Sequence, residues 1–364
     1  MGLKVGAIGG IRLPVERLHV ELTNRCNFSC EFCPDGRMQR ARGSMDFALL
    51  ENIFSQAEGV ARQAHFHVMG EPMLYPRLPA AVRLARQHGL EPWVTTNGSL
   101  LSEEAARELE EAGLAHLTVS LQTPDADRFG LRGCRTLSFD EYKGKIFGAI
   151  RPFLTGRRGM SVTVVFLTNP LKRFLAPDPP TSNFPESARE LRGHLERWAR
   201  GIVRGTSVEC ELPRILARTR KAGVLKENVI YLTEKVRFRV RVLGNWAEHF
   251  ELPVVPARIG YCPGLAENFG ILWNGDWVIC CTDYDGKTSP ANVSGTSMKE
   301  FLSLPEVQRI AQGFRHFRVV HPYCRVCLGE RGVLDSAFRQ VGSIFYFKLY
   351  RKLLAREPAK REAV

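Results

Sequence analysis

The sequence has no apolar run close to the ~20 residues that a membrane-spanning helix requires. Its first residues, Met-Gly-Leu-Lys-Val-Gly-Ala-Ile-Gly-Gly, lack the charged start and the long apolar core of a secretory signal peptide. Ten cysteines in 364 residues would be unusual for a disulfide-rich secreted domain. These absences favour a cytoplasmic protein whose cysteines are metal ligands rather than disulfide bridges.

Acidic residues are the scarcer charge, because 38 Asp and Glu stand against 51 Lys and Arg and leave a net charge of +13. This surplus suggests an anionic partner, and nucleic acid, a phosphorylated metabolite or an anionic membrane surface would each fit. The hydrophobic content of 44% is that of an ordinary globular protein, and the length predicts more than one domain.

Short apolar strands alternate with amphipathic helices from residue 17 to about residue 168, which is typical of parallel β/α units. We expect a helix that begins near Asp46, with Ser44 or Asp46 as its cap, a second over Leu78–Gln87, and a third from Ser102 to Gly113. The fold class is therefore α/β. The strands are expected at Leu18–Leu22, His65–Met69, Pro92–Thr96, Leu117–Leu121 and Val162–Leu167.

A proline-rich segment at residues 170–185 interrupts this alternation and indicates a linker or surface loop. Basic helical stretches follow, around Arg189–Arg204 and Arg214–Lys221. Arginines then alternate with apolar residues, which predicts a strand with one basic face. That face is either solvated or a wall of the substrate cavity that attracts anions; its arginines are Arg237, Arg239 and Arg241.

Three cysteines, Cys26, Cys30 and Cys33, stand close together on a loop that leaves the first expected strand. A [4Fe–4S] cluster normally takes four thiolates, so three close ligands would leave one iron open, and open metal positions are where chemistry occurs. A zinc half-site and buried structural thiols are the alternatives.

The Cys-x3-Cys-x2-Cys spacing, with Phe32 before the last cysteine, resembles the signature of the radical S-adenosylmethionine (SAM) enzymes. The resemblance implies a partial (β/α)6 TIM-like barrel in which SAM binds the open iron of a [4Fe–4S] cluster. Reductive cleavage of SAM would then give a 5′-deoxyadenosyl radical that abstracts hydrogen from a substrate carbon. It also implies that the three cysteines are catalytic ligands and that Phe32 belongs to the cofactor site.

Residues at the ends of the following strands resemble the family's SAM-binding motifs, and such strand ends carry active residues in barrels. The resemblance assigns the SAM amine to a glycine–glutamate segment, the ribose to the end of the fourth strand, and the SAM carboxylate to an arginine fork. Met69 replaces the usual first glycine, and Gln122 stands where many relatives have aspartate. The residues so assigned are Gly70, Glu71, Thr96, Asn97, Ser120, Gln122 and Arg132.

A second set of cysteines accompanies a predicted β-hairpin, because Asn274-Gly275 between apolar strands is a strong hairpin signal. The spacing of its first two cysteines around Gly275 resembles the opening of the SPASM auxiliary-cluster domain. No cysteine follows the last of the set, so the resemblance is to the shortened twitch version with one auxiliary [4Fe–4S] cluster. The expected ligands are Cys262, Cys280, Cys324 and Cys327.

Four thiolates could instead hold a structural zinc ion, and the spacing permits both. Cys281 could replace Cys280 as a ligand, whereas Cys134 and Cys210 are expected to be non-ligands. An oxidation would also need a base. Asp283 and Tyr284 are candidates by their position beyond the hairpin, although turn residues describe the same segment.

We expect an enzyme of the oxidoreductase or maturase type, in which the auxiliary cluster exchanges an electron with the substrate radical. Family resemblance implies oxidation, epimerisation or cross-linking of a sugar-like metabolite, a glycan or a peptide, and the residues leave this choice open. A flavodoxin or ferredoxin would supply the electron. An RNA-modifying radical SAM enzyme and a non-catalytic electron carrier or scaffold are the alternatives.

The expected organisation has five parts. A lead-in precedes the radical SAM barrel core, a basic insertion completes the barrel, and the auxiliary-cluster domain comes next. Helices are expected through Met298–Phe314 and in a basic amphipathic tail, Phe338–Arg356, which is a candidate for weak membrane-surface contact. The corresponding ranges are 1–16, 17–169, 170–254, 255–335 and 336–364.

Overall fold

The computed structural model describes residues 6–155, 159–168, 184–185, 187–224, 227–242, 250 and 253–351. Within this part of the chain, nine strands form one curved sheet in the order β11-β10-β3-β4-β5-β6-β7-β9-β8. Adjacent strands from β10 to β9 run parallel, and the two outer strands pair antiparallel. The strands are β3 (Val15–Val20), β4 (Ala61–Phe66), β5 (Glu91–Thr96), β6 (His116–Gln122), β7 (Ser161–Thr168), β8 (Asn228–Tyr231), β9 (Val236–Val242), β10 (Asn268–Ile271) and β11 (Trp277–Val278).

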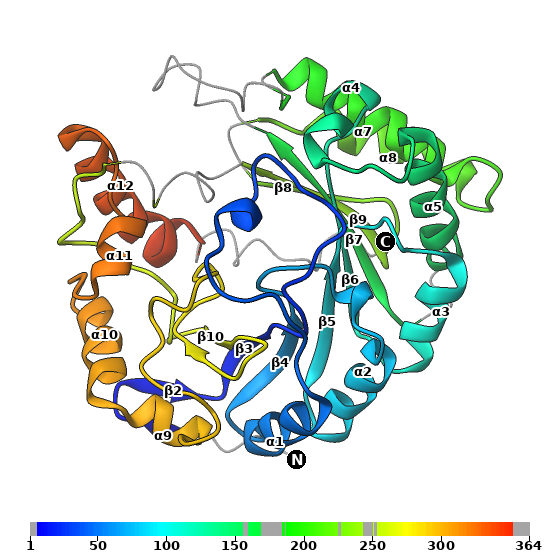
Figure 1. Ribbon diagram of the computed structural model, residues 1–364. Helices are drawn as coiled ribbons and strands as arrows, with labels where there is room; N and C mark the ends of the chain where they lie inside the picture. Colours follow the sequence, from blue (N-terminus) through cyan, green and yellow to red (C-terminus); the bar gives the residue numbers. More distant parts are fainter. Residues whose placement is uncertain are drawn as a thin grey trace.

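Helices cover the outer face of this sheet, and the open inner face carries the candidate site (Figure 1). Outward residues such as Leu18, Phe66 and Phe238 are fully buried, because the helices pack over them. The covering helices are α1 (Phe47–Ala57), α2 (Leu78–Gln87), α3 (Glu103–Glu111), α5 (Phe139–Ile150), α7 (Ala188–Val203) and α8 (Leu212–Thr219), with the short α4 (Ala126–Phe129) between α3 and α5. The expected α/β fold with a partial barrel is confirmed.

Helix caps agree with the sequence at two sites. The Asp46 side chain accepts hydrogen bonds from the backbone N–H groups of Ala48 and Leu49, so Asp46 rather than Ser44 caps α1. Ser102 caps α3 by accepting from the N–H of Ala105. The expected basic helices and the arginine strand are also present, as α7, α8 and β9.

Two expected strand positions were shifted. The first strand begins at Val15 rather than Leu18, and β4 spans Ala61–Phe66 where His65–Met69 was expected. The inner face of the open sheet takes polar side chains such as Gln63, so an apolar pattern does not mark where β4 begins. A hydrogen bond from the His67 N–H to the His65 carbonyl turns the chain directly after the strand.

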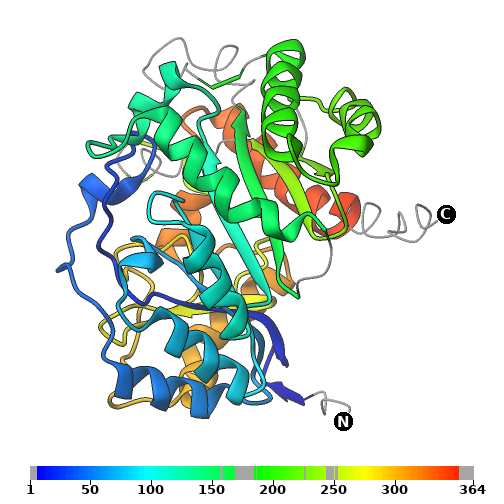
Figure 2. The same cartoon turned by 90° about the vertical axis from the view of Figure 1, so that its right-hand side faces the viewer.

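The C-terminal part joins the same sheet rather than standing apart from it. Strand β10 pairs in parallel with β3, and the predicted hairpin forms as β10 and β11. Figures 1 and 2 show the remaining helices beside this edge. They are α9 (Met298–Ser303), α10 (Pro305–Arg315), α11 (Pro322–Cys327) and α12 (Val333–Phe345). A short antiparallel pair, β1 (Gly6–Ile8) and β2 (Ile11–Leu13), precedes β3.

The single helix expected over Met298–Phe314 was wrong, because it is divided between α9 and α10. Leu304 has an extended backbone with ψ of 136°, and Pro305 then starts the second helix. The tail helix begins earlier than expected, at Val333, and continues as a π-helix over Tyr346–Tyr350. Nearly all of the proline-rich segment and the end of the tail lie outside the described residues.

Helix α12 exposes an apolar stripe, formed by four apolar side chains that recur about once per helical turn. In the part of the chain that the structure describes, no helix is both long enough and apolar enough to cross a membrane. The stripe consists of Leu334, Phe338, Val341 and Phe345, each more than half exposed.

Candidate functional site

The first cysteine set lies on the loop that follows β3, which we call the cluster loop (residues 26–33). Backbone hydrogen bonds hold it against the segment after β6: the N–H of Ser29 donates to the Arg132 carbonyl at 3.1 Å, and that of Glu31 donates to Leu131 at 3.0 Å. In Figure 1 this dark-blue loop extends across the open side of the sheet. The loop is therefore fixed from both sides of the barrel mouth.

Two glycines allow the chain to approach the cluster loop closely. Gly133 has a φ of 58°, and a Cβ there would lie 2.6 Å from the Ser29 carbonyl oxygen. Gly70 has a φ of 78°, and its Cβ would lie 2.3 Å from the Thr23 carbonyl oxygen. Any other residue at either position would be strained and would push away the backbone that it meets, which is the loop itself for Gly133 and the segment before it for Gly70. Gly70 thus lies against the backbone that leads into the cluster loop, and its lack of a side chain permits this contact.

The three thiols of the cluster loop are free and influence one another electrostatically. Burial raises the pKa of Cys26 to about 11 and that of Cys33 to about 12. It raises the pKa of Cys30 as well, while the Arg132 guanidinium opposes the shift. Iron binds the thiolate form, so ligation would release these protons. Three thiols on one loop fit a cluster with one open iron.

Glu71 joins the end of β4 to the end of β5. Its fully buried carboxylate accepts hydrogen bonds from the Met73 N–H at 3.0 Å, the Thr96 hydroxyl at 2.8 Å and the Asn97 N–H at 2.6 Å. Burial raises the pKa of Glu71, and these donors oppose the shift. The strand-end residues that the sequence predicted are therefore brought together, with much of the carboxylate already engaged.

Asn97 links this strand end to the cluster loop. Its Nδ2 donates to the Cys26 sulfur at 3.8 Å and to the Asn27 side chain at 2.9 Å. Its Oδ1 accepts from the N–H of Ser99, and Asn27 donates to the Ser99 hydroxyl at 2.8 Å. Hydrogen bonds to ligand sulfurs are one of the means by which proteins set the potential of iron–sulfur clusters.

Arg132 lies fully buried among the other predicted cofactor residues. Its Nη1 donates to the Ser120 carbonyl at 2.7 Å and to the Gln122 side chain at 2.5 Å. Its guanidinium carbon is 5.0 Å from the centre of the Phe28 ring and 6.0 Å from that of Phe32. The Nε atom is buried with no partner. An unpaired cationic donor beside the thiols fits the carboxylate of SAM.

The second cysteine set is assembled from separate elements. Cys262 precedes β10, Cys280 follows β11, and Cys324 and Cys327 lie on α11. Burial raises the pKa of all four thiols, and Cys262 reaches about 12. Repulsion from other thiolates of the set also raises the pKa of Cys262, Cys280 and Cys324. Cys281 is a further electrostatic neighbour, so it remains an alternative ligand.

The spacing of the second set argues against a preformed zinc site. Zinc–sulfur bonds of ~2.3 Å in a tetrahedron would place sulfur atoms roughly 3.8 Å apart. Among the described residues, the one group of three or more Cys, His, Asp or Glu ligand atoms that all lie within 4.8 Å of one another consists of histidines. No three of these four sulfurs therefore lie as close together as in a preformed zinc site.

Asp283 is a buried residue whose carboxylate holds its own turn together. It has no exposed surface. One carboxylate oxygen accepts from the Lys287 N–H at 2.9 Å, and the other accepts from the N–H and hydroxyl of Thr288 at 2.6 and 2.7 Å. Its carboxylate thus closes its own turn. This geometry favours the turn interpretation, and the role of Asp283 as a base stays a prediction.

A buried ion pair that the sequence analysis missed joins the barrel to the hairpin. The carboxylate of Glu21 accepts from the Arg40 guanidinium, from the Met69 N–H at 3.1 Å and from the Trp273 N–H at 3.2 Å. Arg40 also donates to the Tyr284 carbonyl at 2.5 Å. Burial raises the pKa of Glu21, and Arg40 opposes this. The signal was present as a carboxylate in the alternating apolar and polar run Leu18–Leu22.

The inner face of the sheet is polar and basic. Arg237, Arg239 and Arg241 alternate along β9 with buried apolar residues that pack on the helices. Arg237 donates to the Thr163 hydroxyl at 2.9 Å on the neighbouring strand, and Arg239 pairs with Glu227 at 2.8 Å. Because the arginines lie opposite the helix-covered face, the basic row lines the inner face of the sheet.

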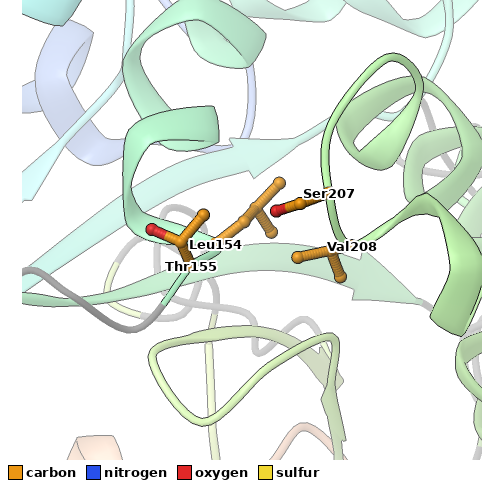
Figure 3. Close-up of a pocket in the computed structure, with 4 residues that line it drawn as sticks. All are labelled: Leu154, Thr155, Ser207 and Val208. Atoms are coloured by element: carbon orange, nitrogen blue, oxygen red, sulfur yellow. The ribbon is translucent and has the colours of Figure 1, made fainter.

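A separate hollow of about 490 Å³ lies away from these residues (Figure 3). It is lined by Leu154, Thr155, Ser207 and Val208. None of these side chains is a cysteine, a histidine or a carboxylate, so this hollow does not resemble a redox or metal site.

Comparison with known proteins agrees with the site. Residues 20–146 match the radical SAM superfamily, and residues 262–328 match the SPASM iron–sulfur cluster-binding domain. The chain therefore contains a radical SAM domain followed by a SPASM-type domain. Its cofactors are SAM with a [4Fe–4S] cluster in the barrel and an auxiliary iron–sulfur cluster in the SPASM-type domain.

The similar proteins carry different activities. A tungsten-containing aldehyde ferredoxin oxidoreductase cofactor-modifying protein of Pyrococcus furiosus is 35% identical over 99 residues, which are 27% of this chain and 28% of that protein. The PqqA peptide cyclase of Gluconobacter oxydans is 35% identical over 128 residues, 34% of this chain and 36% of that protein. The chain thus matches about a third of the length of these relatives.

The fold similarity extends further along the chain. The structure of anSMEcpe with bound AdoMet covers 94% of this chain and 95% of its own, with a TM-score of 0.51 and 14% identity. At that identity the similarity shows a shared fold.

Proposed function

We propose that this protein is a radical SAM redox enzyme in which the two cysteine sets act on one substrate. The observation that carries the proposal is that both sets border the same strand. The cluster loop leaves the end of β3, and Cys280 follows the hairpin whose strand β10 pairs with β3. A substrate bound on the inner face beside β3 would lie near both cofactors.

We assign Cys26, Cys30 and Cys33 as ligands of the SAM-binding cluster. When bound, the cluster would supply one electron to SAM, and SAM would supply the carbon radical that takes a hydrogen atom from the substrate. In this proposal Arg132 orients the SAM carboxylate, and Asn97 fixes the Cys26 sulfur through its side-chain amide. The glycines beside the loop keep water away by close backbone packing.

The proposed overall reaction is an oxidation. The substrate loses one hydrogen atom to the deoxyadenosyl group, one electron to the auxiliary site, and one proton to a base or solvent. A flavodoxin or ferredoxin provides the electron that SAM cleavage consumes. Cys262, Cys280, Cys324 and Cys327 are assigned to the auxiliary site because four thiolates fill a cluster and leave it suited to electron transfer.

An acidic peptide is the proposed substrate class. Two features support it: the basic row on β9 faces the inner side of the sheet, and one relative is named as a peptide cyclase. The Arg239 and Arg241 side chains are 44% and 56% exposed, so they are accessible to a carboxylate.

The test is anaerobic reconstitution with iron and sulfide, followed by reduction with dithionite in the presence of SAM. We expect 5′-deoxyadenosine, detected by chromatography and mass spectrometry, and an increase on addition of Glu- and Asp-rich peptides over Lys-rich ones. Absence of 5′-deoxyadenosine would contradict the reaction class. An increase with phosphorylated sugars but with no peptide would retain the class and replace the substrate.

A further inference from the structure

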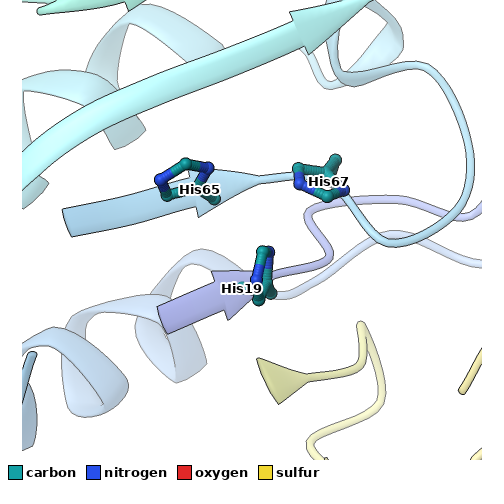
Figure 4. Close-up of side chains that lie close together, drawn as sticks. All are labelled: His19, His65 and His67. Atoms are coloured by element: carbon teal, nitrogen blue, oxygen red, sulfur yellow. The ribbon is translucent and has the colours of Figure 1, made fainter. Parts of the chain in front are cut away.

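Three histidines form a cluster on the inner face of the sheet that includes no cysteine of either set. His19 lies on β3 directly opposite His65 on β4, and His67 follows two residues later on the same side. Their ligand nitrogens all lie within 4.8 Å of one another. Figure 4 shows the rings gathered between the two strands. His19 and His65 face each other because their strands pair in register, and the turn that follows β4 brings His67 to the same cluster.

His19 has a buried polar side chain with no partner. It is 3% exposed, and neither Nδ1 nor Nε2 has a hydrogen-bond partner. Burying an imidazole in this way is costly unless something satisfies its nitrogens. Its neighbours are the other two rings, with centroids 5.4 Å away for His65 and 4.8 Å away for His67.

His65 is oriented as a ligand would be. Its Nε2 is 2.9 Å from the Gln63 side-chain oxygen, which fixes Nε2 as the donor and leaves Nδ1 without a proton. Its ring stacks on Trp93 with centroids 4.9 Å apart. Metal-binding histidines characteristically donate their second ring N–H to such an acceptor, which sets the tautomer and the ring orientation.

A glycine leaves space beside the histidines, and the nearby arginines are neutralised by carboxylates. Gly270 on β10 lies beside His19, and a Cβ there would be 3.3 Å from the His19 Cβ. The nearby cations are Arg17 and Arg241, and each has a carboxylate partner, at 3.2 and 3.5 Å respectively.

We propose that His19, His65 and His67 form a mononuclear site for a divalent metal of the zinc or ferrous type, independent of the cluster cysteines. Imidazole nitrogens suit these metals. Three protein ligands leave a coordination position for water or for an anionic group of the substrate. Because His67 is only partly buried, the open position would face the inner side of the sheet near the basic row.

The test measures zinc on the reconstituted holoprotein, whose two cysteine sets are then occupied by iron. Equilibrium dialysis against micromolar zinc should leave about one zinc per chain. His67→Gln should lose at least tenfold in affinity, whereas the matched variant His316→Gln, at an exposed residue, should bind as the wild type does. Equal binding by His67→Gln and wild type, or no bound zinc, would overturn the proposal.

Zinc-edge X-ray absorption provides a readout that does not depend on a variant. The proposal expects a first coordination shell of nitrogen and oxygen only. A shell dominated by sulfur would place the zinc at cysteines and overturn the assignment. Thermal unfolding of His67→Gln, compared with that of His316→Gln, shows whether the variant is folded, and the absorption spectrum decides the question even where it is not.

Discussion

The two cysteine sets achieve metal binding in opposite ways. The first is contained in one loop, Cys26–Cys33, and the ends of β4, β5 and β6 support that loop through Glu71, Asn97 and Arg132. The second is assembled from a hairpin and the helix α11, between Cys262 and Cys327. The first set therefore depends on loop geometry, and the second exists only when the C-terminal part is folded.

This difference corresponds to different chemistry. Three ligands with the unpartnered Nε of Arg132 beside them fit a cluster that must leave space for SAM. Four ligands from three places fit a closed cluster that passes electrons. The buried pair of Glu21 and Arg40 joins the two halves, so they form one unit.

The largest expected effect separates the two sets by function. Cys30→Ala should abolish 5′-deoxyadenosine formation, because it removes a ligand of the SAM-binding cluster. Cys327→Ala should retain much of the SAM cleavage and lose the oxidised product. Both are measured in the same anaerobic assay, with Cys210→Ala as the control because Cys210 is exposed and outside both sets. Loss of SAM cleavage to the same extent in both variants would contradict the division.

The next effect tests whether the halves form one unit. Glu21→Ala leaves the nearly buried Arg40 guanidinium without its carboxylate and should lower the free energy of unfolding by about 3–5 kcal/mol. Glu267→Ala removes partly exposed pairs to Arg17 and Arg351 and should cost about 1 kcal/mol or less. Chemical denaturation measures both. Equal losses would show that the Glu21 pair does not join the halves.

A smaller effect is expected at Glu71, which supports the first cysteine set and not the second. Glu71→Gln places an amide donor where the carboxylate accepts from the Asn97 N–H, and should cost about 1–3 kcal/mol. It should also reduce the iron retained by the cluster loop and leave the auxiliary iron unchanged. Glu58→Gln, at an exposed residue after α1, is the control. Iron lost from both sites alike would contradict the local role.

The effect that is smallest at neutral pH is a pH dependence located in the barrel. Burial, with Arg237 and Arg239 nearby, lowers the pKa of His116 to about 3. The unfolded state, with a pKa of ~6.5, then takes up the proton first, so His116 contributes fully above that pH. Its contribution falls by about 1.4 kcal/mol per pH unit at most as the pH drops towards 3. His116→Gln should flatten this slope in denaturation at several pH values, and an unchanged slope would contradict it.

Much of the fold and of the first site could be predicted because their determinants are local. The cysteine spacing, the hairpin at Asn274-Gly275 and the Ser102 cap each depend on a few adjacent residues. The predicted cofactor residues at the ends of β4, β5 and β6 do meet beside the cluster loop.

What the sequence did not reveal depends on contacts between distant segments. Glu21 and Arg40 acquire their role only when β10 pairs with β3, and the histidine cluster needs the register of β3 against β4. Asp283 was expected as a base by its position, whereas its burial in a turn is a property of the folded loop. The division at Leu304 could have been read from Pro305.

The most direct test of the account is Mössbauer spectroscopy of the iron-reconstituted protein, with and without SAM. Two clusters predict about eight irons per chain, with one iron site whose signal changes when SAM binds. Cys327→Ala should lose about half of the iron and keep the SAM-sensitive site. About four irons with one zinc held by sulfur, or no iron site that responds to SAM, would contradict the account.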